Sequence, residues 1–246
     1  MNNNNFIIFG QGRSGSTLLR TLLNCHPRVV CELELLSHKR LSKKHPVIQH
    51  VIFPFPIQYL YLKVTFAKSD VFGFKLFMET RENAEHVLKK LYLKNWKVIY
   101  IQRKNIIKQS ISLYIGRQTQ QWVRRPSRPS PTEIYHIEPQ ELKKIIDQNI
   151  SYLKQEKKLL ENMDHLHVVY EEDLFYSDDW QRTADRIFSF LGISSVDVSS
   201  KNVITDLRTD AERIDNFDEI IQFLECNGYS AQVKEYSDYL VKQNQM

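Results

Sequence analysis

Along the chain, short apolar runs alternate with longer stretches in which apolar residues recur every three or four positions. The short runs are typical of β-strands, whereas the longer spacing is typical of amphipathic helices. Five segments are predicted to be strands: Phe6–Phe9, Arg28–Cys31, Val71–Phe77, Lys97–Ile101 and His165–Tyr170. Strands that alternate with helices predict an α/β fold, in which a central, mainly parallel sheet carries helices on both faces.

The first helix is predicted directly after the first strand, because leucines at 18, 19, 22 and 23 share one helical face. Further helices are predicted at Arg81–Lys94, around 107–122, and at Trp180–Leu191, Asp215–Cys226 and Ala231–Lys242. Gly192 follows the third of these and is a typical helix stop.

Three segments depart from the alternation of strands and helices. Val123–Pro139 contains four prolines and is predicted to be a loop, either a solvated connection or a mobile cover over the site. A helical insertion on the acceptor side is expected near 36–68, and a helical C-terminal segment over 213–246. Length and the absence of repeats predict a single domain over 1–246.

The composition narrows the class of protein. The 246 residues are 42% hydrophobic and 26% charged, as in an ordinary globular protein. A net charge of +5 is too weak to predict nucleic-acid binding, but it is compatible with an anionic ligand. Three cysteines without a C-x-x-C pair favour a reducing compartment over disulfides or structural zinc. Neither a signal peptide nor a bilayer-spanning stretch is visible, so we expect a cytoplasmic protein without membrane insertion.

The strongest chemical signal is the glycine-rich turn between the first strand and the first helix. Gly10, Gly12 and Gly15 allow the backbone to bend tightly there. Free N–H groups of the turn and the positive end of the helix dipole then face one concavity, which suits a phosphate or a similar anion. The alternative is a plain structural turn.

Three ligand classes compete for this turn. The spacing of Gly10 and Gly15 resembles a P-loop, but Ser16 stands where the nucleotide-binding lysine is expected, which disfavours ATP or GTP hydrolysis. The glycines also satisfy the weak G-x-G-x-x-G dinucleotide pattern. Arg13 within the turn, with Ser16 and Thr17 after it, adds a cation and two hydroxyls that suit a terminal dianion. This favours a group-transfer donor.

A second anion site is indicated at the predicted strand Lys97–Ile101. Arg103 lies just after the strand, at the edge where parallel sheets bind ligands, and Ser112 follows on the next helix. An arginine and a serine so placed can bind one phosphate together. An ordinary strand-to-helix link with solvated charges is the alternative.

Taken together, these stretches resemble the sulfotransferases that use 3′-phosphoadenosine 5′-phosphosulfate. The nearest likeness is to the bacterial carbohydrate and small-molecule branch similar to trehalose sulfotransferase. The resemblance covers the chain to about Leu191. It rests on these segments: Gly12–Thr17, His26-Pro27, Glu34–Leu36, Gly73–Leu76, Arg103–Ser112, Arg117–Trp122 and Val169–Leu174.

The resemblance implies a P-loop-like three-layer fold and a set of site residues. The residues it assigns to donor binding are Gly12, Arg13, Ser14, Gly15, Ser16, Thr17, Arg103 and Ser112. It makes Glu34 the general base, while Lys75 and Arg13 stabilise charge on the donor. Glu32 and His38 remain alternatives for the base. Lys104 also matches the spacing of the 3′-phosphate motif, and Leu33 departs from the small residue that many members place there.

The implied reaction is an in-line displacement at sulfur that leaves 3′,5′-bisphosphoadenosine. The acceptor would be a hydroxyl or amine of a small molecule or carbohydrate, and no metal is expected because no Asp/Glu pair calls for one. Two other functions stay open: a P-loop-type nucleotide or small-molecule kinase, and a module that senses nucleotides without turnover. Oligomeric state is not predicted.

Overall fold

The structure is a computed structural model that describes residues 4–37, 54–67, 69–80, 83–120, 122, 132–200 and 208–243. The chain divides into two compact units. We call them the sheet unit, Met1–Gln102 with Lys154–Ser200, and the helical unit, Arg103–Leu153 with Lys201–Met246. The single domain over 1–246 stays a prediction.

The sheet unit contains a five-stranded, fully parallel sheet within the described residues. Its strands are β1 Phe6–Gly10, β2 Val29–Glu32, β3 Val71–Phe77, β4 Lys97–Gln102 and β5 His165–Val169. They lie in the order β2-β3-β1-β4-β5. Strand β1 is therefore central, with Gly10 paired to Phe77 of β3 and to Ile101 of β4.

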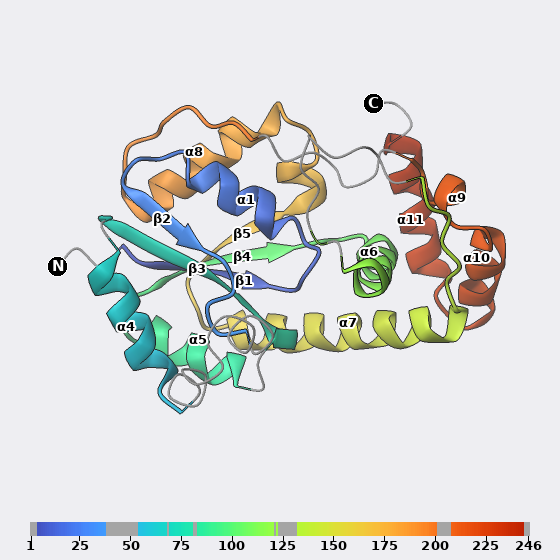
Figure 1. The fold of residues 1–246 in the computed structure, drawn as a ribbon, viewed down its shortest axis with the longest axis horizontal. Coiled ribbons are helices and arrows are strands. Elements are labelled where there is room, and N and C mark those ends of the chain that lie inside the picture. Colours follow the sequence, from blue (N-terminus) through green and yellow to red (C-terminus); the bar gives the residue numbers. More distant parts are fainter. Residues whose placement is uncertain are drawn as a thin grey trace. The chain divides into compact units, whose positions relative to one another are not determined.

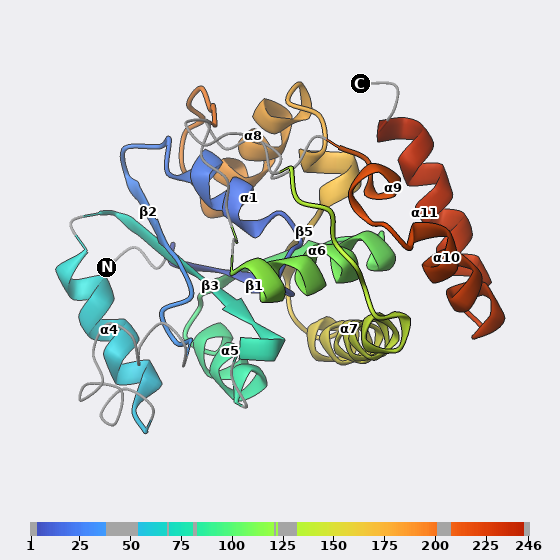
Figure 2. The same cartoon turned by 45° about the vertical axis from the view of Figure 1, so that its right-hand side comes forward.

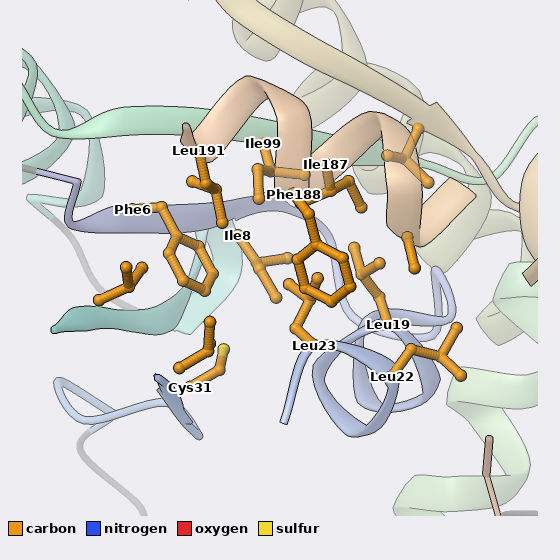
Figure 3. Packing of buried hydrophobic residues seen from close by; sticks show 14 of the residues in the cluster. Phe6, Ile8, Leu19, Leu22, Leu23, Cys31, Ile99, Ile187, Phe188 and Leu191 are labelled. Carbon is orange, nitrogen blue, oxygen red and sulfur yellow. The ribbon is translucent and has the colours of Figure 1, made fainter. Parts of the chain in front are cut away.

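Helices cover both faces of the sheet because successive strand residues point to opposite sides. In β1, Phe6 and Ile8 belong to one buried cluster, and Ile7 and Phe9 belong to another. The first cluster packs against α1 Ser16–Leu23 and α8 Asp179–Leu191, as Figure 3 shows. The second packs against α4 Pro56–Phe66 and α5 Ala84–Tyr92 on the other side of the sheet (Figure 1).

This arrangement places a topological switch point at the carboxyl edge of the sheet. Strands β1 and β3 are neighbours, yet α1 after β1 and α5 after β3 cover opposite faces (Figure 2). Their connecting segments therefore leave the sheet in opposite directions, which is where open α/β sheets bind ligands. The turn after β1 and a short 3₁₀ helix, Met78–Thr80, lie at this point.

The helical unit contains α6 Ile106–Thr119, most of α7 Pro139–Leu160, α9 Asp210–Arg213, α10 Phe217–Cys226 and α11 Ser230–Gln243. Two helix starts are fixed by polar side chains. The side chain of Asn105 accepts a hydrogen bond from the Lys108 amide, and Thr209 forms a capping box with Glu212. Because such caps satisfy amides that the helix leaves open, the sequence itself sets where α6 and α9 begin.

The predicted α/β class and all five strands are confirmed, with ends that differ by one residue at most. The principal omission is α7, because no element is predicted between Pro139 and the last strand. Helix α4 lies within the insertion expected near 36–68, while 38–53 and 68 are outside the described residues. Of the predicted loop, 123–131 also lie outside, and its last residue begins α7. The C-terminal helical segment begins at Asp210, three residues earlier than predicted.

None of the described helices combines the length and the apolar character that crossing a bilayer requires.

Candidate functional site

The turn after β1 has a conformation that only glycine permits at one position. Gly15 has φ +88°, and a Cβ added there would collide with the ring of Tyr170. Arg13 also adopts a left-handed φ of 64°, which is uncommon for a residue with a side chain. The backbone is thus bent at Arg13 and Gly15, immediately before α1, as the sequence predicts for an anion-binding turn.

Two contacts stabilise the shape of the turn, one within it and one to α7. The buried Ser14 hydroxyl donates to the carbonyl of Gln11 at 2.7 Å, and Gln11 Nε2 donates to Glu156 at 3.2 Å. Gly15 is the N-cap of α1 and has no side chain with which to cap the helix. The first amides of α1 are therefore available to a ligand, with the positive end of the helix dipole behind them.

A carboxylate already contacts this turn. The Gly12 amide donates to Glu79, which lies in the 3₁₀ helix just after β3. A Cβ at Gly12 would lie 2.7 Å from the same carboxylate oxygen, so a larger residue there would displace the Glu79 carboxylate. The turn thus offers an amide that binds an anionic oxygen. Sequence reasoning missed Glu79, although its place after a parallel strand is the kind of signal that singled out Arg103.

Two predicted catalytic residues lie in direct contact beside the turn. The ammonium of Lys75 is 2.6 Å from Glu34 Oε1, and it donates to the Thr17 hydroxyl at 3.2 Å. The side chain of Lys75 is 4% exposed and that of Glu34 is 20% exposed. Burial lowers the pKa of Lys75, and the charge of Glu34 counteracts this shift. Lys75 therefore connects the candidate base to the first turn of α1.

Glu34 owes its place to contacts between α1 and the end of β2. Arg20 Nε and Asn24 Nδ2 donate to the Cys31 carbonyl at 2.8 and 3.0 Å, and the Cys31 amide donates back to Asn24 at 2.8 Å. Burial raises the pKa of the Cys31 thiol to about 12, which keeps it protonated.

Glu32 ends β2 and is half-buried, and the other alternative base, His38, lies outside the described residues.

A second buried carboxyl group supports the turn from behind. Glu156, near the end of α7, accepts hydrogen bonds from Gln11 Nε2 and from the Tyr100 hydroxyl at 3.1 Å. Burial, helped by the nearby charge of Glu79, raises the pKa of Glu156 to about 7, although the hydrogen bonds from Gln11 and Tyr100 oppose this shift. This residue was also missed, because α7 itself was not predicted.

The helical unit holds the remaining site residues. Arg103 is the first residue after β4, its Nη2 lies 3.4 Å from the Tyr239 hydroxyl, and its Cζ lies 5.9 Å from the centroid of that ring. Lys104 is exposed, and Ser112 is half-buried on α6. The structure therefore brings Glu34, Lys75 and the turn together in one unit and describes Arg103 and Ser112 in the other.

A buried ion-pair network lies within the helical unit. Asp210 accepts from Lys108 Nζ at 2.7 Å, from Arg213 Nε at 2.7 Å and from the Tyr236 hydroxyl. Although burial opposes its ionisation, the charges of Lys108 and Arg213 hold the pKa of Asp210 at about 2. Burial lowers the pKa of Lys108 to about 8, against the attraction of Asp210. This network was not foreseen, because its members come from α6, α9 and α11.

Comparison with known proteins gives one family match and several similar folds. A family model described as "Sulfotransferase family" matches residues 5–51, which include β1, the turn, α1, β2 and Glu34. No curated protein sequence matches the chain. The match covers the segment that carries the turn and the candidate base, but less than half of the chain.

Among solved structures, a sulfotransferase from Alicyclobacillus acidocaldarius has a TM-score of 0.54 and 15% identity, over 94% of each chain. The sulfotransferase domain of the Synechococcus PCC 7002 olefin synthase has a TM-score of 0.46 and 16% identity, over 98% of this chain and 95% of that one. Shikimate kinase from Bacteroides thetaiotaomicron has a TM-score of 0.43 and 9% identity, over 77% of this chain and 98% of that one. The likeness to the Alicyclobacillus protein shows a shared fold, and a sulfotransferase pattern covers the part of this fold that forms the turn.

Proposed function

We propose that the protein is a sulfotransferase that moves a sulfuryl group from 3′-phosphoadenosine 5′-phosphosulfate to a hydroxyl or amine of a small-molecule or carbohydrate acceptor. The observation that carries the proposal is the contact of Lys75 with both Glu34 and Thr17, beside an anion-binding turn. A cation, a carboxylate and helix amides meet there within the segment that the sulfotransferase family model reaches, with Lys75 added from β3.

The donor would be bound by two groups of residues. The amides and hydroxyls of Gly12–Thr17 and the guanidinium of Arg13 suit the 5′-phosphosulfate, because each can donate to anionic oxygens. Arg103 and Ser112 suit the 3′-phosphate, since a guanidinium can bind phosphate through two parallel hydrogen bonds. The Gly12 amide, which donates to the carboxylate of Glu79, supports this assignment of the turn.

In the proposed reaction, an acceptor oxygen or nitrogen attacks sulfur opposite the bridging oxygen of the donor. A bond from acceptor to sulfur forms, the bond from sulfur to the 5′-phosphate oxygen breaks, and the electron pair stays on that phosphate. Glu34 takes the proton of the acceptor, and Lys75 and Arg13 stabilise the charge on the leaving phosphate. The contact between Lys75 and Glu34 couples these roles, because a lysine drawn to the leaving phosphate releases the carboxylate for the proton.

Positive side chains supply the charge stabilisation in this scheme. A sulfuryl group carries less charge than a phosphoryl group, so amides and cations around the turn meet the requirement that Mg²⁺ meets in phosphoryl transfer. Ser16, in the place of the P-loop lysine, is the feature that weighs against a nucleotide kinase.

Ligand-dependent melting of the protein tests the donor class. Adenosine 3′,5′-bisphosphate should raise the melting temperature, whereas ATP with Mg²⁺ and NAD should not, because only a ligand of the native state stabilises it. Stabilisation by ATP with Mg²⁺ alone would favour the kinase. Incubation with ³⁵S-labelled donor and a panel of sugars, alcohols and amines then tests transfer. Binding of bisphosphate without transfer to any acceptor would favour a sensing module.

A further inference from the structure

The C-terminal helix α11 carries a tyrosine that contacts Arg103. Tyr239 is 8% exposed, and its hydroxyl and ring both face the guanidinium, at 3.4 Å from Nη2 and 5.9 Å from Cζ. An arginine side chain has several rotatable bonds, and its use as a planar phosphate ligand depends on the orientation of the guanidinium plane. A ring beside that plane restricts it through packing and cation–π attraction.

Helix α11 is itself anchored to α6. Tyr236 of α11 donates to the same Asp210 that receives Lys108 from α6 and Arg213 from α9. Tyr236 and Tyr239 are three residues apart, so they occupy one face of α11. The buried carboxylate therefore fixes the helix that carries Tyr239 relative to the helix that begins just after Arg103.

From these contacts we propose that Tyr239 is a positioning residue: it holds the guanidinium of Arg103 in the orientation that receives the 3′-phosphate of the donor. This inference rests on the proposed function. It assigns a role in nucleotide selection to the C-terminal helix, a segment that the resemblance to sulfotransferases barely reaches. The selectivity for a 3′-phosphorylated nucleotide then depends on Tyr239 as well as on Arg103.

The readout is a ratio of affinities. Calorimetric titration gives the Kd of adenosine 3′,5′-bisphosphate and of adenosine 5′-phosphate, which differ only in the 3′-phosphate. In Tyr239→Leu, which loses both ring and hydroxyl, the preference for the bisphosphate should fall about fivefold, as expected for a lost cation–π contact. In Tyr239→Phe, which keeps the ring, it should fall by less than about twofold. Affinity for adenosine 5′-phosphate should stay at the wild-type level in both.

A matched control is Tyr236→Phe. It removes a hydroxyl from the same face of α11, but the bond that is lost goes to Asp210. This variant should have a lower melting temperature and an unchanged affinity ratio, because the buried ring of Tyr236 still packs α11 in place. A purely structural role for Tyr239 would make the two tyrosines behave alike, with lost stability and no change of ratio.

A double-mutant cycle with Arg103→Ala completes the test. With Arg103 absent, Tyr239→Leu should have no further effect on the ratio. An unchanged ratio in Tyr239→Leu, or effects of the two substitutions that simply add, would overturn the inference and leave the proposed function intact. If Tyr239→Leu does not fold, a ratio in Tyr239→Phe that falls about fivefold or more would also overturn it, because the ring would then not be what holds the arginine. Wild-type protein without any preference for the bisphosphate would instead overturn the proposed function, and the inference with it.

Discussion

The sheet unit and the helical unit each bury a lysine against a carboxylate, and the two pairs differ in what surrounds them. In the helical unit, Asp210 is fully buried, and Arg213 and Tyr236 join Lys108 around it. In the sheet unit, Glu34 keeps a fifth of its side-chain surface exposed, and Lys75 also donates to Thr17 beside the glycine-rich turn. The same pair of charges is enclosed by other protein groups in the helical unit, whereas in the sheet unit it is partly exposed and lies beside the proposed donor site.

The comparison teaches that an ion pair indicates function only when its charged groups can also contact a substrate or another ligand. The oxygens of Asp210 are taken up by protein donors, so that carboxylate has no capacity for a substrate. Glu34 contacts Lys75 and keeps a fifth of its side chain exposed, and a carboxylate in that setting can exchange partners. Both lysines have a lowered pKa because of burial, so the pKa direction alone does not separate the two pairs.

The largest effect on stability is expected at the buried pair of Lys108 and Asp210. Asp210→Asn removes the charge between two buried cations, and such a loss costs about 3–5 kcal/mol of folding free energy. Chemical denaturation of wild type and variant measures it. A loss below about 1 kcal/mol would mean that the network contributes little to the stability of the helical unit.

At the partly exposed pair of Lys75 and Glu34, the large effect should be on turnover. Glu34→Gln keeps the size of the side chain and removes the base, so sulfuryl transfer should fall about a hundredfold or more while donor affinity changes little. Single-turnover rates with ³⁵S-labelled donor, together with the Kd of the bisphosphate, separate these quantities. Unchanged transfer would place the base elsewhere, with Glu32 the next residue to replace.

Arg103→Ala tests the phosphate assignment in the helical unit. Affinity for adenosine 3′,5′-bisphosphate should fall about 10- to 100-fold, the value of a charge-assisted contact, whereas adenosine 5′-phosphosulfate should lose much less. Lys104→Ala is the matched control, because its side chain is exposed on the adjacent position. Equal losses for both ligands would refute the assignment, and a larger loss in the control would transfer the role to Lys104.

The smallest effect concerns Glu156, the buried carboxyl group behind the turn. Its pKa in the folded protein is raised by burial to about 7, above its ordinary 4.5, so the folded state favours the protonated form. The stability this provides is full below pH 4.5 and is lost as the pH rises through about 7. The wild type should therefore lose roughly 1–3 kcal/mol relative to Glu156→Gln between these pH values.

Denaturation of wild type and Glu156→Gln across pH 4.5–8 measures this difference. Parallel curves for the two proteins would contradict a raised pKa. Since Glu156 accepts from Gln11, the same series with bound bisphosphate shows whether its ionisation also affects the turn.

Much of the fold was readable from the sequence because its signals are local. Strand β3 was predicted with its observed ends from a run of apolar residues, and Gly192 marked the end of α8. Helix α7 escaped prediction because its exposed face is densely charged, although the buried residues Leu142, Ile145 and Ile146 follow helical spacing. Its omission also concealed Glu156.

The sequence by itself determined the glycine-rich turn, because Gly15 and the strand and helix on either side of it are contiguous and the backbone requirement is local. Only the tertiary structure decided which charges meet. Lys75 reaches Glu34 through the pairing of β3 with β2, and Asp210 receives Lys108 from 102 residues away. Such pairs depend on which elements pack together, and packing is set by the summed burial of apolar surface rather than by the charged residues themselves.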